Sequence, residues 1–348
     1  MAQQHLEPTD PLAQPVAGES LADYLRSQAT EFLRALRQHR ETGVGSSGSQ
    51  ESVGAARSLR RSARRISGSL HTYRPLLDAD WSEGMRPELA WLSGTLAAEY
   101  DCAARLERLL TALHRLSGSV TLPAQTAGTP GGAPPMPERG NLTVGAAKAG
   151  ALLDRQLTLA RTRAHSTALQ ALGSSRFHAV ADKVAVLASE VPLTPAAPDA
   201  DLRAHAAAAE ERLSDAIAGL PLVTAGSPYN AEALIHGLSP DPAPHPQDGP
   251  WHQVRLLLRL HRYALEVLYG HGQDAPVNVR LLAAGQALNR HRDASEAAAA
   301  AAHAARTPRI APATAYALGV LHADQRHEVE AARFAFQQSW QKQTVSTS

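Results

Sequence analysis

The sequence predicts an all-α fold, and three observations carry this prediction. Aromatic residues make up only 4% of the 348-residue chain, so side chains that favour strands are scarce. Hydrophobic residues make up 44%, which is enough to form a sizeable core. Apolar side chains recur at helical spacing along most of the chain, and no stretch alternates convincingly at strand spacing.

The expected helices follow one another with loops of distinct composition between them. Residues 1–17 are polar and contain prolines, and we expect a disordered tail there. The first helix begins at Ser20, a residue type that caps helices, and covers 20–41. Further helices are expected at 51–74, 87–117, 143–172, 174–189, 199–219, 229–238 (short), 250–270, 275–305 and 312–342. Residues 118–141 are rich in glycine and proline and predict a surface loop.

The charge and cysteine content limit the classes of site. With 34 basic and 33 acidic residues the net charge is +1, so any attraction for a polyanion must be local. Only three of the basic residues are lysines, which leaves arginine as the main cation. The single cysteine, Cys102, excludes an intrachain disulfide and fits a reducing compartment. We find no signal-peptide layout and no run of 18 apolar residues, and therefore expect a cytoplasmic protein without a membrane partner.

The helix expected at 51–74 has one basic and one apolar face. The basic sector contains Arg57, Arg60, Arg61, Arg64 and Arg65, with His71 two turns further on. The opposite sector contains Leu59, Ala63, Ile66, Leu70 and Tyr73. A solvated charged face is the alternative interpretation, but such a face usually mixes signs, because like charges one turn apart repel. No acidic residue is interleaved here, which favours a binding role.

The segment at 251–268 repeats this layout. Its basic sector contains His252, Arg255, Arg259 and Arg262, and its apolar sector contains Val254, Leu257, Leu258, Leu265 and Leu268. At an offset of 195 residues, three basic positions coincide: Arg57 with His252, Arg60 with Arg255, and Arg64 with Arg259. An acidic residue follows each segment, Asp101 and Asp293. This predicts a tandem repeat of two pseudo-symmetric helical bundles, about 18–192 and 199–345, with a basic groove between them. Other arginines, such as Arg26, Arg37, Arg203 and Arg333, are expected to be scattered over the surface.

Enzymatic and metal-binding readings find little support. Phosphate-binding loops, zinc-protease motifs and nucleophile elbows are all absent, and no catalytic residue is predicted. The 16 histidines are dispersed, so no metal site and no cofactor are expected. His261 falls in an apolar sector and is expected to be a hydrogen-bonded core histidine, whereas His252 is expected to contact a polyanion. Asp101 and Asp293 are expected to neutralise or orient neighbouring arginines.

The two basic segments carry a resemblance to a known family. ARSLRRSARRISGSLHTYRPLLD resembles the opening motif of the CHAD family, the conserved-histidine α-helical domain, and WHQVRLLLRLHRYALEVL and LNRHRDASEAA are similar to its second copy. The resemblance covers about 18–345 and implies two helical bundles with a basic channel that binds inorganic polyphosphate, without known catalysis and with possible targeting to polyphosphate granules and their proteins. The matching positions are Arg60, Arg64 and Arg65 in the first copy and His252, Arg255, Arg259 and Arg262 in the second.

The chain departs from the family pattern at several positions. Arg57 stands where the family has a histidine, Ala90 and Leu282 stand where many members have a basic residue, and Leu260 replaces another. These departures keep two alternatives open: a nucleic-acid-binding protein, which the lack of aromatic or amide side chains on the basic faces disfavours, and a degenerate CHAD scaffold for protein contacts.

Overall fold

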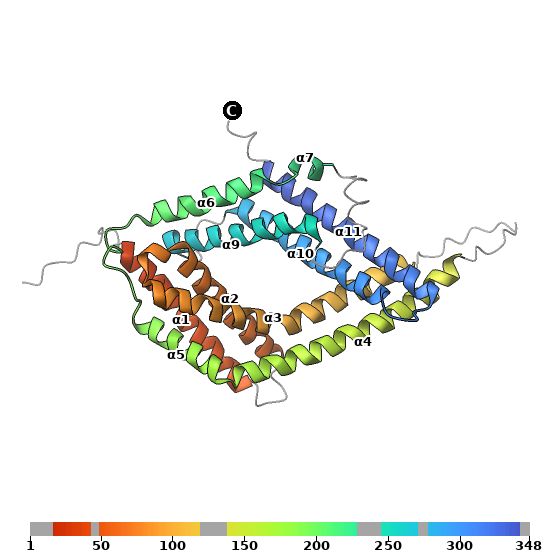
Figure 1. Ribbon diagram of the computed structural model, residues 1–348, viewed down its shortest axis with the longest axis horizontal. Helices are drawn as coiled ribbons and strands as arrows, with labels where there is room; N and C mark the ends of the chain where they lie inside the picture. The colour runs from red at the N-terminus through yellow and green to blue at the C-terminus, as the bar shows by residue number, and fades with distance from the viewer. Residues whose placement is uncertain (1–16, 43–48, 119–137, 228–244, 271–277, 342–348) are drawn as a thin grey trace, which may run out of the picture. The chain divides into compact units, whose positions relative to one another are not determined.

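The computed structural model describes residues 17–42, 49–118, 138–227, 245–270 and 278–341. These residues form helices joined by short connections, and the all-α prediction is confirmed (Figure 1). The elements are α1 (Ala17–Thr42), α2 (Ser49–Thr72), η1 (Arg74–Leu76), α3 (Ala79–Leu116), α4 (Glu138–Leu172), α5 (Ser175–Ser189), α6 (Leu202–Ala218), α7 (Leu222–Ala225), η2 (Pro246–Asp248), α9 (Gly249–Tyr269), α10 (Val279–Ala305) and α11 (Pro312–Gln341). The short helix expected at 229–238 and most of the tail at 1–17 lie outside the described residues.

α1 begins at Ala17, three residues before Ser20, and the starts of α3 and α4 differ more from the sequence-based expectation. α3 begins at Ala79 rather than near residue 87, because the Asp78 carboxylate accepts a hydrogen bond from the Trp81 backbone N–H at 2.8 Å and caps the helix. Pro87 therefore lies inside α3 and not at its start, where the sequence had predicted it. α4 begins at Glu138, so the last residues of the predicted 118–141 loop are helical.

The described chain forms two compact units, each assembled from three separate stretches. Unit 1 comprises 1–90, 179–208 and 263–275, and unit 2 comprises 91–178, 209–262 and 276–348. The predicted division into halves at 18–192 and 199–345, with its pseudo-symmetry, remains a prediction from the sequence.

Unit 1 is organised around the packing of α1 against α2, which run side by side (Figure 1). The end of α9 joins this unit, where the Tyr73 hydroxyl donates to the Ala264 carbonyl at 3.2 Å. The chain after α5 returns to η1, where Leu77 and Leu193 form an isolated antiparallel bridge. No strand is found in the stretches that the structure describes.

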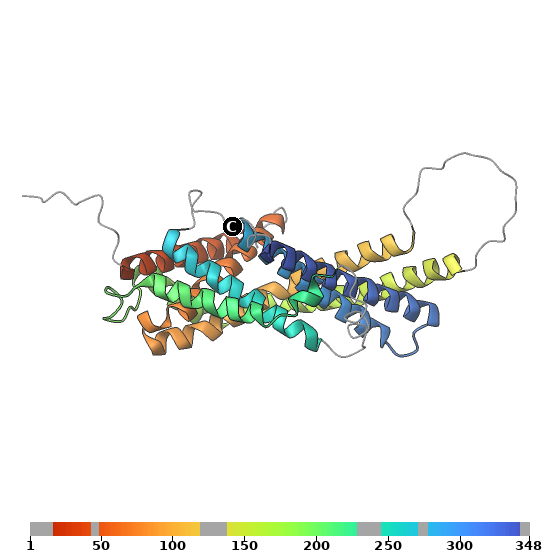
Figure 2. The same ribbon diagram turned by 90° about the horizontal axis from the view of Figure 1, so that it is seen from above.

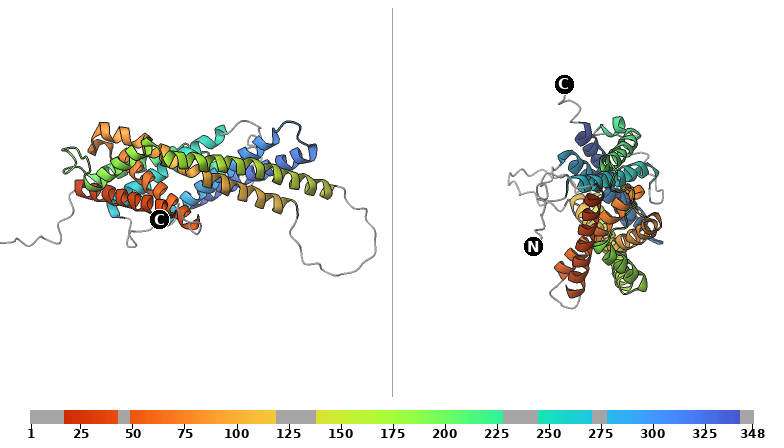
Figure 3. Two further views of the ribbon diagram at one scale, coloured as in Figure 1. Left: turned by 90° about the horizontal axis from the view of Figure 1, so that it is seen from below. Right: turned by 90° about the vertical axis from the view of Figure 1, so that its left-hand side faces the viewer.

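Unit 2 has a core built from four helices. α10 packs along α11, and α11 packs against α4 (Figures 1 and 2). The end of α3 lies beside α4, as the left view of Figure 3 shows. The shared core contains Leu109 and Leu113 of α3, Ala149 and Leu153 of α4, Ala297 and Ala301 of α10, and Leu318 and Leu321 of α11. Small residues allow close approach: a side chain on Gly145 would collide with the backbone carbonyl of Ala313.

Candidate polyanion-binding site

The apolar face of α2 lies where the sequence predicts it. Leu59, Ala63, Ile66 and Leu70, together with Tyr73 just after the helix, all have 0% exposure. Burial of this face turns the opposite, basic sector of α2 away from the core of unit 1.

The basic sector of α2 differs in exposure from residue to residue. The side chains of Arg57, Arg61 and His71 are exposed, and those of Arg60 and Arg64 are half-buried. Within the described part of the chain, Arg61 and Arg64 form no ion pair with a carboxylate. Their guanidinium groups therefore keep N–H groups that could donate hydrogen bonds to an anion.

Arg65 belongs to the same sector but has an internal partner. Its Nε and a terminal nitrogen donate to the two carboxylate oxygens of Glu266 at 2.8 and 3.2 Å. Glu266 also accepts a hydrogen bond from the Tyr24 hydroxyl at 2.9 Å. Burial alone would lower the pKa of Arg65, but the hydrogen bonds to Glu266 raise it. The fold thus already neutralises the charge of Arg65.

The basic sector of α9 lies in unit 2. His252, Arg255 and Arg259 are half-buried, and Arg262 is exposed. Arg255 Nε donates to the side-chain oxygen of Asn289 at 2.8 Å, which orients it. Arg262 has no carboxylate partner among the described residues.

The remaining α9 predictions are partly met. Val254 and Leu258 are buried, whereas Leu257, Leu265 and Leu268 are half-buried. His261 is 4% exposed, as expected for a core histidine. Because the α2 sector lies in unit 1 and the sector from His252 to Arg262 lies in unit 2, a single groove lined by both remains a sequence-based hypothesis.

The positions that lack a basic residue fall in different environments. Leu260 is buried, so the side chain at this position adds nothing to the basic sector. Ala90 and Leu282 are exposed, and there a surface charge is absent relative to the family pattern.

Asp101 has the neutralising role expected of it. Its carboxylate accepts from Arg292 at 2.7 Å, and Arg292 also pairs with Glu296, which accepts from Arg105 at 2.6 Å. These ion pairs between alternating acidic and basic side chains join α3 to α10 inside unit 2. Asp293, the other acidic position, has an exposed side chain.

A buried charge cluster at the start of α9 was missed by sequence reasoning. Asp248, with 0% exposure, accepts hydrogen bonds from Arg326 at 2.8 Å, from Arg333 at 2.7 Å and from the Ser295 hydroxyl. Burial by itself would raise the pKa of the Asp248 carboxyl. The hydrogen bonds with His291 and Arg326 together have the larger effect and hold this pKa well below its usual range. The spacing of seven residues between Arg326 and Arg333, which places them on one helix face, was the signal available in the sequence.

Arg333 therefore corrects an expectation. The sequence placed it among scattered surface arginines, whereas its side chain is 5% exposed and pairs with both Asp248 and Glu330. Arg37 and Arg203 are exposed as expected, and Arg26 is half-buried beside Asp23.

His291 connects this cluster to the basic sector of α9. Its ring stacks on Trp251 at 5.6 Å between centroids and meets His252 edge-on at 5.5 Å. Its Nε2 lies 3.3 Å from Arg333 Nε and 3.5 Å from an oxygen of Asp248. Burial and the charge of Arg333 outweigh the nearby carboxylate and lower the pKa of His291 to about 4.

This shift predicts acid sensitivity of the fold. The pKa of His291 is about 6.5 in the unfolded chain and about 4 in the folded protein. Protonation therefore favours the unfolded chain, so the free energy of unfolding has its full value above about pH 6.5 and falls as the pH drops toward 4. At about pH 5 the expected loss is ~2 kcal/mol relative to about pH 7.5. Urea unfolding at both pH values measures it, and His291→Gln, which cannot titrate, should lose most of the pH dependence. An equally pH-dependent His291→Gln protein would contradict this assignment.

Among the described residues no group of three or more histidine, cysteine or acidic side chains could hold a metal ion. None of the helices formed by these residues has an apolar stretch that could cross a bilayer.

The comparison with protein families is decisive for classification. The family model described as the CHAD domain matches residues 27–302, which is most of the chain. The protein belongs to the CHAD family. A solved structure described as PptA from Streptomyces chartreusis is 70% identical, covers 94% of this chain and 99% of its own, and superposes with a TM-score of 0.77.

A second solved structure is more distant. The CHAD domain from the plant Ricinus communis is 17% identical over 92% of both chains, with a TM-score of 0.47. No match is found among curated proteins. Family membership agrees with the motifs in α2 and α9, which both fall inside the matched CHAD region.

Proposed function

We propose that this CHAD protein binds inorganic polyphosphate through the basic sectors of α2 and α9 and catalyses no reaction itself. One observation carries the proposal: each sector gathers several arginines on one helix face, and some of these arginines have no carboxylate partner, unlike several arginines elsewhere in the fold. Arg105, Arg115, Arg292, Arg326 and Arg333 each contact an acidic side chain. Arg61, Arg64 and Arg262 have no such partner among the described residues. Each predicted sector thus presents uncompensated positive charge on one helix face.

Polyphosphate suits these sectors better than nucleic acid does. Single-stranded nucleic acid is held largely by stacking of its bases on exposed aromatic rings. Of the aromatic residues in α9 and directly after α2, Tyr73, Trp251 and Tyr263 are buried, and Tyr269 at the very end of α9 is exposed. A linear chain of phosphates offers only charged oxygens, which guanidinium groups bind bidentately.

The proposal includes how the sectors are used. His252 is half-buried, and burial lowers its pKa. A bound phosphate chain would act in the opposite direction, because its negative charge favours the protonated imidazole. We propose that both sectors contact one polyphosphate chain, as the groove hypothesis requires, and that such binding could bring the protein to polyphosphate granules.

The test is a titration with long-chain polyphosphate, ATP and single-stranded DNA. We expect polyphosphate to bind far more tightly than the other two. Because each neutralised phosphate releases a counterion, contacts with about four phosphates should weaken binding roughly 100-fold between about 50 mM and about 200 mM salt. Equal or tighter binding of DNA would favour the nucleic-acid alternative, and binding of none of them would favour a scaffold for protein contacts.

A further inference from the structure

A pocket in unit 2 combines one unpaired cation with apolar walls. It has a volume of about 340 Å³ and lies among α6, α7, α9, α10 and the end of α11. None of its lining residues belongs to the basic sectors proposed above to bind polyphosphate. Its size lies within the range of small-molecule sites.

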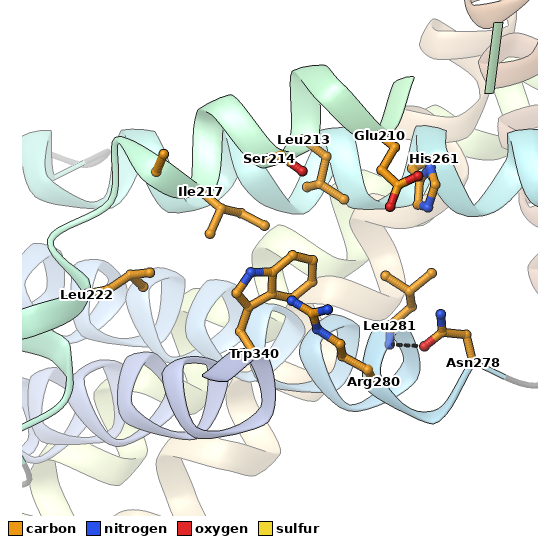
Figure 4. A pocket seen from close by; sticks show the side chains of 11 residues that line it. Glu210, Leu213, Ser214, Ile217, Leu222, His261, Asn278, Arg280, Leu281 and Trp340 are labelled. Atoms are coloured by element: carbon orange, nitrogen blue, oxygen red, sulfur yellow. Dashed lines mark hydrogen bonds between the residues drawn. The ribbon is translucent and has the colours of Figure 1, made fainter. Parts of the chain in front are cut away.

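Arg280 is the cationic group of this pocket. Its guanidinium carbon lies 3.7 Å from the centroid of the Trp340 ring, so the indole covers one face of the guanidinium plane (Figure 4). The Nε atom is buried and has no hydrogen-bond partner in the described part of the protein. Burial lowers the pKa of Arg280, and the attraction of Glu210 offsets this only in part. Arg280 has therefore lost hydration without gaining a bonded carboxylate.

The surroundings of Arg280 select the kind of anion. Leu213, Ile217 and Leu222 line the wall formed by α6 and α7, across from Trp340 (Figure 4). Asn278 is held in place because its side-chain oxygen accepts from the Leu281 backbone N–H at 3.1 Å, which leaves only its NH2 group as a polar donor for an anion. Glu210 also lines the pocket and would repel a ligand that carries several negative charges.

We propose that this pocket binds a small monocarboxylic acid with an apolar body. The carboxylate would accept two parallel hydrogen bonds from the edge of the Arg280 guanidinium, which its stacking on Trp340 leaves accessible. The hydrocarbon part would lie against Trp340, Ile217 and Leu222. Inorganic phosphate and polyphosphate fit less well, because they would leave these apolar walls uncovered and face Glu210.

The test is isothermal titration calorimetry of the full chain with octanoate, octanamide and inorganic phosphate. Octanamide has the same shape without the charge, and we expect it to bind at least about tenfold more weakly than octanoate. Arg280→Met, which keeps the stem on Trp340, should weaken octanoate binding by about tenfold or more, and Arg280→Lys by less, because the bidentate contact is lost but the charge remains. Arg290→Met, an exposed arginine on the same helix, is the matched control and should change nothing.

Three outcomes would overturn the proposal. These are equal affinity for octanoate and octanamide, no effect of Arg280→Met in a protein with unchanged circular dichroism, and phosphate binding as tight as that of octanoate. If Arg280→Met fails to fold, the comparison of octanoate with octanamide on the unaltered protein still decides. Polyphosphate titration of the same variants separates this site from the proposed function, since Arg280→Met should leave polyphosphate affinity within about twofold.

Discussion

Replacing Asp248 with alanine should destabilise the protein by about 3–5 kcal/mol, the usual cost of removing one partner from a buried ion pair. Arg326 would be left with a side chain that is 3% exposed and with no other carboxylate partner in the described chain. Arg333 would keep Glu330 at 2.7 Å, so its loss is smaller. Urea unfolding followed by far-UV circular dichroism measures the change.

A surface pair provides the matched control for Asp248. Asp23 pairs with Arg26, and their side chains are 74% and 43% exposed, so Asp23→Ala should cost less than about 1 kcal/mol. Adding Arg326→Met to Asp248→Ala should recover part of the lost stability, because it removes the uncompensated charge. If Asp248→Ala were no more costly than Asp23→Ala, the cluster would have no structural role.

Reversing the charge of Arg61, Arg64, Arg259 and Arg262 together to glutamate should weaken polyphosphate binding by about 1,000-fold or more. Each of these arginines is expected to supply charge-assisted hydrogen bonds, and the reversal adds repulsion. The fold should survive, because all four side chains are exposed or half-buried and relieve crowding of like charges when replaced. Reversal of the exposed arginines Arg37, Arg163, Arg203 and Arg212 changes the net charge equally and should cost far less affinity.

Reversing the α2 pair and the α9 pair separately tests whether both sectors bind one polyphosphate chain. If both sectors hold one chain, Arg61→Glu with Arg64→Glu and Arg259→Glu with Arg262→Glu should each lower the affinity without changing the stoichiometry. If the sectors are independent sites, the unaltered protein should bind two short chains and each pair should abolish one. Equal losses in the two quadruple variants would instead mean that binding depends on total charge alone.

The fold was accessible from the sequence because helix faces are a local property. The period of apolar residues placed Leu59, Ile66 and Leu70 on one side of α2, and all three are fully buried. The start of α3 was predicted wrongly, because the sequence pattern placed it at Pro87. The Asp78 cap instead begins this helix at Ala79, eight residues before Pro87. Proline is tolerated wherever the missing N–H and the ring can be accommodated.

The site was less accessible, because a periodic pattern does not show what lies opposite a charged residue. Arg61 and Arg65 have the same spacing signal, yet only Arg65 meets a carboxylate, supplied 201 residues later by Glu266. Arg333 looked like a surface arginine because Asp248 is 85 positions away. Such pairings depend on tertiary packing, which a single sequence encodes only indirectly.

The assembly of unit 1 from distant stretches has a consequence for how the protein is made. α1 and α2 leave the ribosome early, but Glu266, which binds both Tyr24 and Arg65, is nearly 200 residues further on. At synthesis rates of roughly 5–20 residues per second, the helix pair waits about 10–40 s for this partner. During that interval α1 must shield the apolar face of α2, since an uncovered apolar helix face is prone to aggregation during translation.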